Sequence, residues 1–362
     1  MSSINKKISL RQAMLLFLFP MISATIALVP SLANESAKQA AWISPFISII
    51  LFGLFLFVLQ SFYKKYKEVS LIDIFGDIIG KIFGKIVFIL YFAWITINCA
   101  SYFRFFTERL TMSTFSNTNT WVLIVALIIL SSFILRGGLE VLARLNEVLF
   151  TIVFLFLIIV FILIFPQFKI ANYFPLTYKD ALPVLCGNVS IIATWAFFIV
   201  ILMFSDKITN MDKIKKMGFK AILIMGVLTL IIIIIPLGMY GASYLSVLTM
   251  PFFSAIRQIS LFNIIERIEG SIISLWILSD FMLLCIFAYS ALHILKKVFS
   301  LSQIKSLINI YLIGIIIISL LMCRNVLEFV IYCDKICCPV NLFFGYLIPL
   351  IVFIIGKIRK KI

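Results

Sequence analysis

The sequence is poor in the residues that most enzymes use. One histidine in 362 residues excludes a histidine-rich metal centre and chemistry that needs two histidines. The absence of a G-x-x-x-x-G-K-[ST] phosphate loop excludes ATP hydrolysis by that route. The seven cysteines are an odd number without zinc-ligand spacing, so neither a zinc site nor a complete disulfide framework is expected. We therefore expect a protein that is not an enzyme, with no catalytic residues, no metal and no cofactor.

Charge is scarce as well, and its scarcity indicates the class of protein. Charged residues make up 13% of the chain and apolar residues 63%, whereas soluble domains carry about 25% and about 45–50%. A chain this apolar needs lipid around its core, so the lipid bilayer is an expected partner. The net charge of +16 lies largely in blocks that flank apolar runs, such as residues 357–361. Membrane anchoring explains these blocks, and no nucleic-acid partner is expected.

Apolar runs of about 20 residues, the length that crosses the hydrocarbon core, predict the architecture. We expect an all-α integral membrane protein with ten transmembrane helices. No interval between them is long enough for a separate soluble domain, so residues 1–362 are predicted to form a single transmembrane domain. The predicted helices cover approximately residues 10–30, 42–62, 85–105, 120–136, 144–165, 183–204, 219–243, 271–292, 304–322 and 340–357.

The basic residues predict how these helices are oriented. With the N-terminus in the cytoplasm and ten crossings, 22 of the 31 lysines and arginines fall on the cytoplasmic side. Cytoplasmic loops of membrane proteins carry such an excess, so both termini are expected to be cytoplasmic. The outer segments then hold the remaining basic residues, including Arg104 and Arg109. None of the basic residues is expected in a ligand site.

Three further segments carry a local prediction. Residues 66–83 have apolar positions on one helical face and predict an amphipathic helix on the cytoplasmic surface. Residues 251–269 mix apolar and charged positions and predict an external helix or lid. Cys333, Cys337 and Cys338 fall in a predicted outer loop, where they could pair, although no functional role is expected of them.

Proline and polar residues within the spans predict where helices break. Pro20 lies halfway through the first span, with Ser23 and Thr25 just after it. Proline removes a backbone donor and clashes with the preceding turn. In transporters with inverted repeats, such broken helices place free backbone groups at the bilayer midplane, where substrate binds. A simple kink is the alternative, because proline is common in membrane helices.

The sixth span is the expected partner of the first. It is unusually polar, with Asn188, Ser190, Thr194 and Trp195 in its outer and middle parts. If the ten helices form two halves of five, over approximately residues 10–165 and 183–357, the first and sixth spans occupy corresponding positions. We therefore expect a 5+5 inverted repeat in which helices 1 and 6 are broken.

Asp280 is the only acidic residue deep within a predicted span. A carboxylate at the bilayer centre costs roughly 2.5–3.5 kcal/mol on insertion scales and marks a functional site by default. Asp280 is therefore a candidate for ligand binding or proton exchange. The alternative is a neutral side chain that hydrogen-bonds a neighbouring helix. Asn98 in the third span is a further polar candidate, although such residues often serve helix–helix contacts.

Four stretches together resemble the GerAB-type spore germination proteins. These proteins are the B subunits of endospore germinant receptors, within the amino acid–polyamine–organocation transporter superfamily. The resemblance covers essentially the whole chain. It is carried by ISLRQ at 8–12, MISATIALVP at 21–30, RGGLEVLARLNEVLF at 136–150 and PFFSAIRQISLFNIIERIEGSIISLWILSDF at 251–281.

The resemblance implies a fold of two inverted five-helix repeats, with broken helices 1 and 6 framing the ligand site. It also implies a germinant sensor that works with A and C receptor subunits in the spore inner membrane and binds a small nutrient such as an amino acid. The superfamily's Gly-x-Gly falls on Ser23, Ala24 and Thr25, so this chain departs from that pattern. The expected ligand-binding residues are Pro20, Ser23, Ala24, Thr25, Asn98, Asn188, Ser190, Thr194, Trp195 and Asp280.

Other interpretations stay open from the sequence. A proton-coupled amino acid permease that uses Asp280 is the main alternative function, and a scaffold with a vestigial pocket is another. Arg136, Glu140, Arg144 and Glu147 recur on one helical face with alternating sign. They predict either a brace within the chain or a docking surface for a partner subunit.

Overall fold

The structure is a computed structural model that describes residues 7–113, 120–248, 250–258, 268–322 and 326–362. Within these ranges almost every element is a helix. The two strands found there, β1 (Ile8–Ser9) and β2 (Ile208–Thr209), are two residues long and pair in parallel. They join the start of the first helix to the segment that follows α7.

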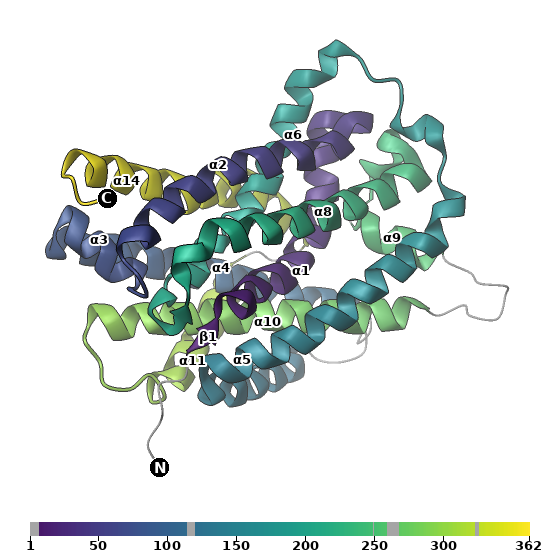
Figure 1. Ribbon diagram of the computed structural model, residues 1–362. Helices are drawn as coiled ribbons and strands as arrows, with labels where there is room; N and C mark the ends of the chain where they lie inside the picture. Colours follow the sequence, from purple (N-terminus) through teal and green to yellow (C-terminus); the bar gives the residue numbers. More distant parts are fainter. Residues whose placement is uncertain (1–6, 114–119, 249, 259–267, 323–325) are drawn as a thin grey trace.

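The helices follow one another along the chain with short connections (Figure 1). Those of the first half are α1 (Leu10–Ala37), α2 (Ser44–Lys65), α3 (Leu71–Ile79), α4 (Lys81–Ser113), α5 (Thr120–Ile164), α6 (Ala181–Trp195) and α7 (Phe198–Leu202). Those of the second half are α8 (Ile214–Leu245), α9 (Pro251–Arg257), α10 (Ile268–Val298), α11 (Leu307–Leu321), α12 (Val326–Tyr332), α13 (Cys338–Leu342) and α14 (Ile348–Ile358).

Seven helical segments within the described ranges are long and apolar enough to cross a membrane, and α11 is a shorter apolar helix. Two of the seven are much longer than one crossing. Leu10–Lys65 has 56 residues and contains both α1 and α2, and Val122–Gln167 has 46 residues. Each covers two of the predicted spans, and in each the chain changes direction (Figure 1). The expectation of an all-α membrane protein is confirmed.

The change of direction within α5 is made by a glycine. Gly138 has φ +80° and ψ −173°, a backbone conformation that is essentially restricted to glycine because it has no Cβ. The two limbs of α5 meet at an angle in Figure 1. The residue therefore turns the chain between the predicted spans 120–136 and 144–165 without a loop.

The predicted break in the first helix is wrong for this conformation. α1 is helical from Leu10 to Ala37 and includes both Pro20 and Pro30. Each proline removes a single backbone donor, so the helix bends along its length instead of ending (Figure 1). The sixth span does contain an interruption. α6 ends at Trp195, α7 begins at Phe198, and the Phe197 amide donates to the Thr194 carbonyl at 3.3 Å, a tighter turn than in an α-helix.

The predicted surface helix over 66–83 is shorter than expected. α3 covers only Leu71–Ile79, capped by the Ser70 side chain at its start and followed by Gly80, whose φ is +101°. Its apolar face is buried as predicted, but Ile82 and Phe83 are exposed, because the left-handed backbone at Gly80 separates them from α3 and places them in α4.

Basic segments predicted to share the cytoplasmic side gather around α3. Lys297 at the end of α10 contacts the Asp73 carboxylate at 2.9 Å, and Lys361 near the C-terminus contacts that of Asp77 at 3.0 Å. Lys297 also lies 3.4 Å from Asp206, which bonds the buried His293 ring at 3.2 Å. Charge pairs therefore link α3, α10, the loop after α7 and the C-terminal segment at one end of the bundle.

Two other local predictions have different outcomes. Cys333, Cys337 and Cys338 do not lie in a loop: they are buried free thiols in a π-helical turn and the α13 helix that continue α12. The loop prediction failed because Lys335 and Pro339 interrupt the apolar run without ending the helix. Of the predicted outer segment 251–269, α9 forms the first part, and residues 259–267 lie outside the described residues.

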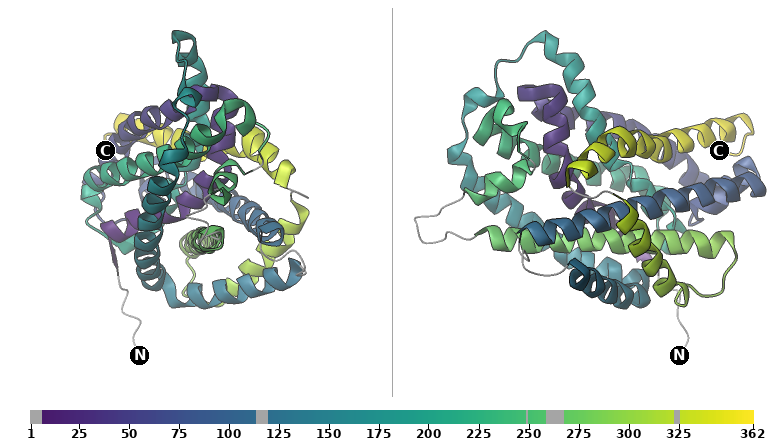
Figure 2. Two further views of the ribbon diagram at one scale, coloured as in Figure 1. Left: turned by 90° about the vertical axis from the view of Figure 1, so that its right-hand side faces the viewer. Right: turned by 180° about the vertical axis from the view of Figure 1, so that it is seen from behind.

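The core is organised around α1 and α10. α1 contacts α5, α6, α8 and α10, and α10 also contacts α4 and α5. The left view of Figure 2 looks along α10, with other helices arranged around it. Residues that face one another across α1, α4 and α10 are therefore shielded from lipid and can hold polar chemistry.

Candidate functional site

A buried ion pair lies at the junction of α4 and α10. An Arg109 guanidinium nitrogen donates a hydrogen bond to Asp280 Oδ2, and the two residues are 5% and 4% exposed. The prediction that Arg109 lies in an outer segment is therefore wrong, because α4 carries this residue into the core beside Asp280. α4 continues to Ser113, beyond the predicted end at residue 105, because the carboxylate of Asp280 compensates the buried cation.

Aromatic rings enclose the guanidinium group. The Arg109 guanidinium carbon lies 4.2 Å from the ring centroid of Phe105 and 4.2 Å from that of Trp276. The Phe105 ring stacks in turn on Phe329 of α12, with 4.1 Å between centroids. Cation–π contacts of this kind strengthen when they are desolvated. The planar arginine therefore fits this position in a way that a lysine would not.

The Asp280 carboxylate also holds the first helix. Ser23 of α1 donates its hydroxyl proton to Asp280 Oδ1, and Trp276 Nε1 donates to Ser23 Oγ at 2.8 Å. Both carboxylate oxygens thus accept hydrogen bonds, as expected of an ionised group, which has acceptors only. Asp280 links α1 to α4 through a charge that is fully enclosed.

Ser279 bonds to the backbone of α1 at the turn that follows Pro20. Its hydroxyl donates to the Phe19 carbonyl at 2.6 Å and accepts from the Ser23 amide at 3.3 Å. In a regular helix these two backbone groups bond each other, because they are four residues apart. A side chain inserted at such a pair is a recognised cause of helix bending. Ser279 therefore ties α10 to the turn of α1 that follows Pro20, within a helix that stays continuous.

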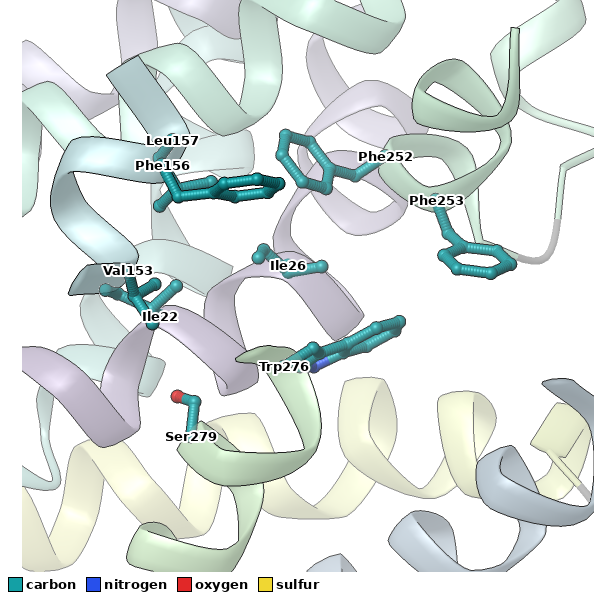
Figure 3. Close-up of a pocket in the computed structure, with 9 residues that line it drawn as sticks. All are labelled: Ile22, Ile26, Val153, Phe156, Leu157, Phe252, Phe253, Trp276 and Ser279. Atoms are coloured by element: carbon teal, nitrogen blue, oxygen red, sulfur yellow. The ribbon is translucent and has the colours of Figure 1, made fainter. Parts of the chain in front are cut away.

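A small apolar cavity lies beside this cluster. Its volume is about 20 Å³, enough for roughly one water molecule. Figure 3 shows the Phe156 and Phe252 rings on one side of Ile26 and the Trp276 indole on the other. The lining residues come from α1, α5, α9 and α10: Ile22, Ile26, Val153, Phe156, Leu157, Phe252, Phe253, Trp276 and Ser279.

The predicted site residues of α1 lie close together in the core. Pro20, Ser23, Ala24 and Thr25 are all buried, and the Thr25 hydroxyl has no hydrogen-bond partner among the described residues. Of these four, Ser23 bonds directly to Asp280. Asn98 of α4 donates to the Trp94 carbonyl of its own helix at 2.9 Å.

The predicted site residues of α6 face a different neighbour. Asn188 accepts a hydrogen bond from Ser48 of α2. Ser190 and Thr194 donate to carbonyls one turn back in α6, and the buried Trp195 packs edge-on against Phe52 of α2, with 6.1 Å between centroids. Their hydrogen bonds and this ring contact are with α2 and their own helix, although α6 also packs against α1. Ligand binding by them stays a prediction.

Arg109 and Trp276 are the site residues that sequence reasoning missed. Arg109 follows an apolar run, and its charge predicts a place in the outer segment. The available signal was its spacing, because Phe105 lies four residues earlier, which places the ring beside the guanidinium on one helical face. Trp276 lies four residues before Asp280, so the same periodicity links those two side chains.

Two of the sequence motifs meet in space. Gln12, in the segment ISLRQ, donates to the Glu147 carboxylate at 3.3 Å, and Arg11 lies 3.5 Å from it. Glu147 belongs to the segment RLNE of α5, and Arg144 pairs with Glu140 one turn earlier. These contacts favour the brace within the chain over the docking surface.

Comparison with known proteins identifies the family. The sequence matches a family described as "Spore germination protein" over residues 7–326. Spore germination protein YndE of Bacillus subtilis (strain 168) is 23% identical over 367 residues, which is 100% of this chain and 99% of that protein. Spore germination protein KB of the same strain is 24% identical, over 98% of this chain and 96% of its own length. Spore germination protein A2 is 25% identical, over 94% and 93%. The chain therefore belongs to this family of spore germination proteins.

Proposed function

We propose that this chain is the membrane subunit of a spore germinant receptor, and that it senses a small nutrient such as an amino acid. The observation that supports this function is the buried cluster that Arg109, Asp280 and Ser23 form in a member of the spore germination family. Charged residues inside a membrane protein mark functional sites. Here the charge pair joins three helices, so a ligand that competes for it also changes how those helices are held.

The expected mechanism is a shift between two conformations. A nutrient that binds one arrangement of α1, α4 and α10 more tightly than another shifts the population towards it, in proportion to the difference in affinity. Ser23 is the natural point of change, because its hydroxyl bonds Asp280 while its amide contacts Ser279. Weakening those bonds frees the bent part of α1 to move against α10. The polar residues of α6, Asn188 to Trp195, are proposed to join the site in the other conformation.

The proposed setting follows from topology and family. We place the chain in the spore inner membrane with both termini cytoplasmic, as ten crossings in a 5+5 inverted arrangement. The two overlong segments each count as two crossings in this proposal, and α11 as one. A and C receptor subunits are the proposed partners, and they would receive the conformational change as the signal.

A germination assay tests the function. Spores that lack this chain are exposed to a panel of amino acids and sugars, singly and in combination, and the fall in optical density is followed. We expect the response to at least one nutrient to be lost and to return when the chain is restored. Asp280→Asn should fail to restore it, whereas Asp212→Asn, at an exposed position in the loop before α8, should succeed.

Two outcomes would overturn the proposal. If spores without this chain still germinate normally in response to every nutrient of the panel, the proposed receptor function is wrong. Gradient-driven accumulation of labelled amino acid in vesicles that contain this chain alone would favour a permease. The level of each variant in the spore membrane must be measured in parallel, since an unpaired buried arginine can prevent folding.

A further inference from the structure

The buried charges offer both halves of a zwitterion site. Among the described side chains, Arg109 and Asp280 are the only arginine, lysine, aspartate or glutamate that are buried. A free amino acid carries a carboxylate and an ammonium group, and each needs a partner of opposite charge once it is desolvated. Arg109 can accept the carboxylate and Asp280 the ammonium. One buried pair is then exchanged for two, and no charge is left without a partner.

The apolar cavity lies next to this pair, separated from it by one side chain. The Trp276 indole lines the cavity, contacts the Arg109 guanidinium and bonds Ser23. Ser279 also lines the cavity and precedes Asp280 in the chain. Figure 3 shows the indole at one edge of the cavity, across Ile26 from the Phe156 and Phe252 rings. A movement of that ring would connect the apolar space with the charged groups.

The chemistry of the cavity selects the kind of side chain. Apart from the Ser279 hydroxyl and the Trp276 ring nitrogen, the lining is aliphatic and aromatic. A hydroxyl or charge placed there would lose its water without gaining an adequate partner. The cavity of about 20 Å³ has room for about one water molecule, which is less space than a branched aliphatic side chain needs. Such a side chain must therefore displace part of the wall, where Trp276 contacts Arg109 and the α9 residue Phe253 lies beside Trp276, with 6.1 Å between ring centroids.

We propose that this cavity is the specificity subsite for an aliphatic amino acid side chain, and that Trp276 is the gate between it and the Arg109–Asp280 pair. The inference rests on the proposed function, and it names the protein group that contacts each part of the ligand. The carboxylate contacts Arg109, the ammonium contacts Asp280, and the side chain enters beside Phe253. Entry moves the indole and breaks its bond to Ser23, which couples recognition of the side chain to the first helix.

Binding to the purified chain in lipid nanodiscs tests the subsite. The informative ligand pair is valine and threonine, which have nearly the same shape but differ by a hydroxyl. A hydrophobic pocket discriminates such a pair by about 10- to 100-fold, and we expect valine to bind more tightly by that factor. Phe253→Ala should move the preference from valine towards leucine, while the exposed substitution Phe299→Ala should leave it unchanged. Equal affinity for valine and threonine would overturn the subsite.

A second comparison tests the charged contacts. Isobutylamine is valine without its carboxylate, so the wild-type chain should bind it at least 10-fold more weakly. Arg109→Gln should remove that difference, because the carboxylate then has no cation to contact. Trp276→Phe keeps an aromatic ring but lacks the N–H, and we expect it to abolish the ligand-induced change in tryptophan fluorescence while valine still binds. If Arg109→Gln does not fold, an unchanged fluorescence response in Trp276→Phe alone refutes the gate.

Failure of this inference can be told from failure of the receptor function. If deletion spores lose a nutrient response while the chain shows no valine preference, the subsite is wrong and the receptor role stands. If the chain prefers valine as expected while deletion spores germinate normally, the subsite stands and the receptor role is wrong.

Discussion

Removing one partner of the buried Arg109–Asp280 pair should destabilise the protein far more than removing both. Asp280→Leu leaves the guanidinium, which is 5% exposed, without its carboxylate. Arg109→Met leaves the carboxylate without its cation. Losing one partner of a buried pair costs about 3–5 kcal/mol, whereas replacing both by apolar residues of similar volume is often close to neutral. The double variant should therefore recover most of the stability that each single variant loses.

Melting temperature in detergent, followed by fluorescence-detected size exclusion, is the assay for this cycle. The control is the exposed pair of Glu140 and Arg144, whose arginine side chain is 70% exposed. Surface pairs contribute about 0–1 kcal/mol, so Glu140→Gln and Arg144→Met should shift the melting temperature little, singly or together. Additive losses in the Arg109→Met/Asp280→Leu double variant would refute the reasoning, because they would show that the two side chains do not stabilise one another.

Three further predictions concern the helices and the charge pairs at one end of the bundle. Ser279→Ala should lower the free energy of unfolding by about 1–2 kcal/mol, since two hydrogen bonds to α1 are lost. It should also speed hydrogen exchange at the Ser23 amide, which donates to the Ser279 hydroxyl. Unchanged exchange would contradict the role of Ser279 at this turn. Gly138→Ala should cost about 1–3 kcal/mol because of its positive φ, whereas Gly314→Ala in α11, where no neighbour lies within 4 Å, should be neutral or stabilising. Burial raises the pKa of Asp206, but the His293 hydrogen bond and nearby cations outweigh it and hold the pKa at about 2. Because the pKa of an aspartate in the unfolded chain is about 3.9, the ionised form should stabilise the fold by about 2 kcal/mol above pH 4, and this stabilisation should be lost as the pH falls through 2. The melting temperature should therefore fall with pH in the wild-type chain and fall less in Asp206→Asn; equal pH dependence in the two would contradict this.

The contrast between a receptor and a permease depends on what the site does after binding. A permease must expose the site to both sides of the membrane in turn, whereas a receptor needs only two states with different affinities. The charge pairs that Lys297 and Lys361 make with α3 link three segments at one end of the bundle. Their loosening on ligand binding would provide the change that partner subunits detect, without any passage of solute.

The pattern of apolar and charged residues determined a large part of this protein without any tertiary information. Lipid as the solvent, the all-α fold, the positions of most spans and the place of Asp280 within a helix all follow from run length and from the cost of charge in hydrocarbon. The family could also be recognised from the sequence, because each of its motifs is a short continuous stretch of residues. These features need only short stretches of chain, and short stretches are what a single sequence displays directly.

Only the tertiary structure decided what surrounds Asp280. Run length alone ended the third span before Arg109, since it counts a charge as a cost and cannot see a partner 171 residues away. The bend of α1 shows the same limit. Pro20 predicts a kink or a break in this helix, but the hydrogen bond from the Ser279 hydroxyl of α10 to the Phe19 carbonyl is visible only in the structure. The Arg109–Asp280 pair and the bonds of Ser279 to α1 each join residues from different helices. The sequence therefore predicts some of the residues of the site, but only the fold brings them together.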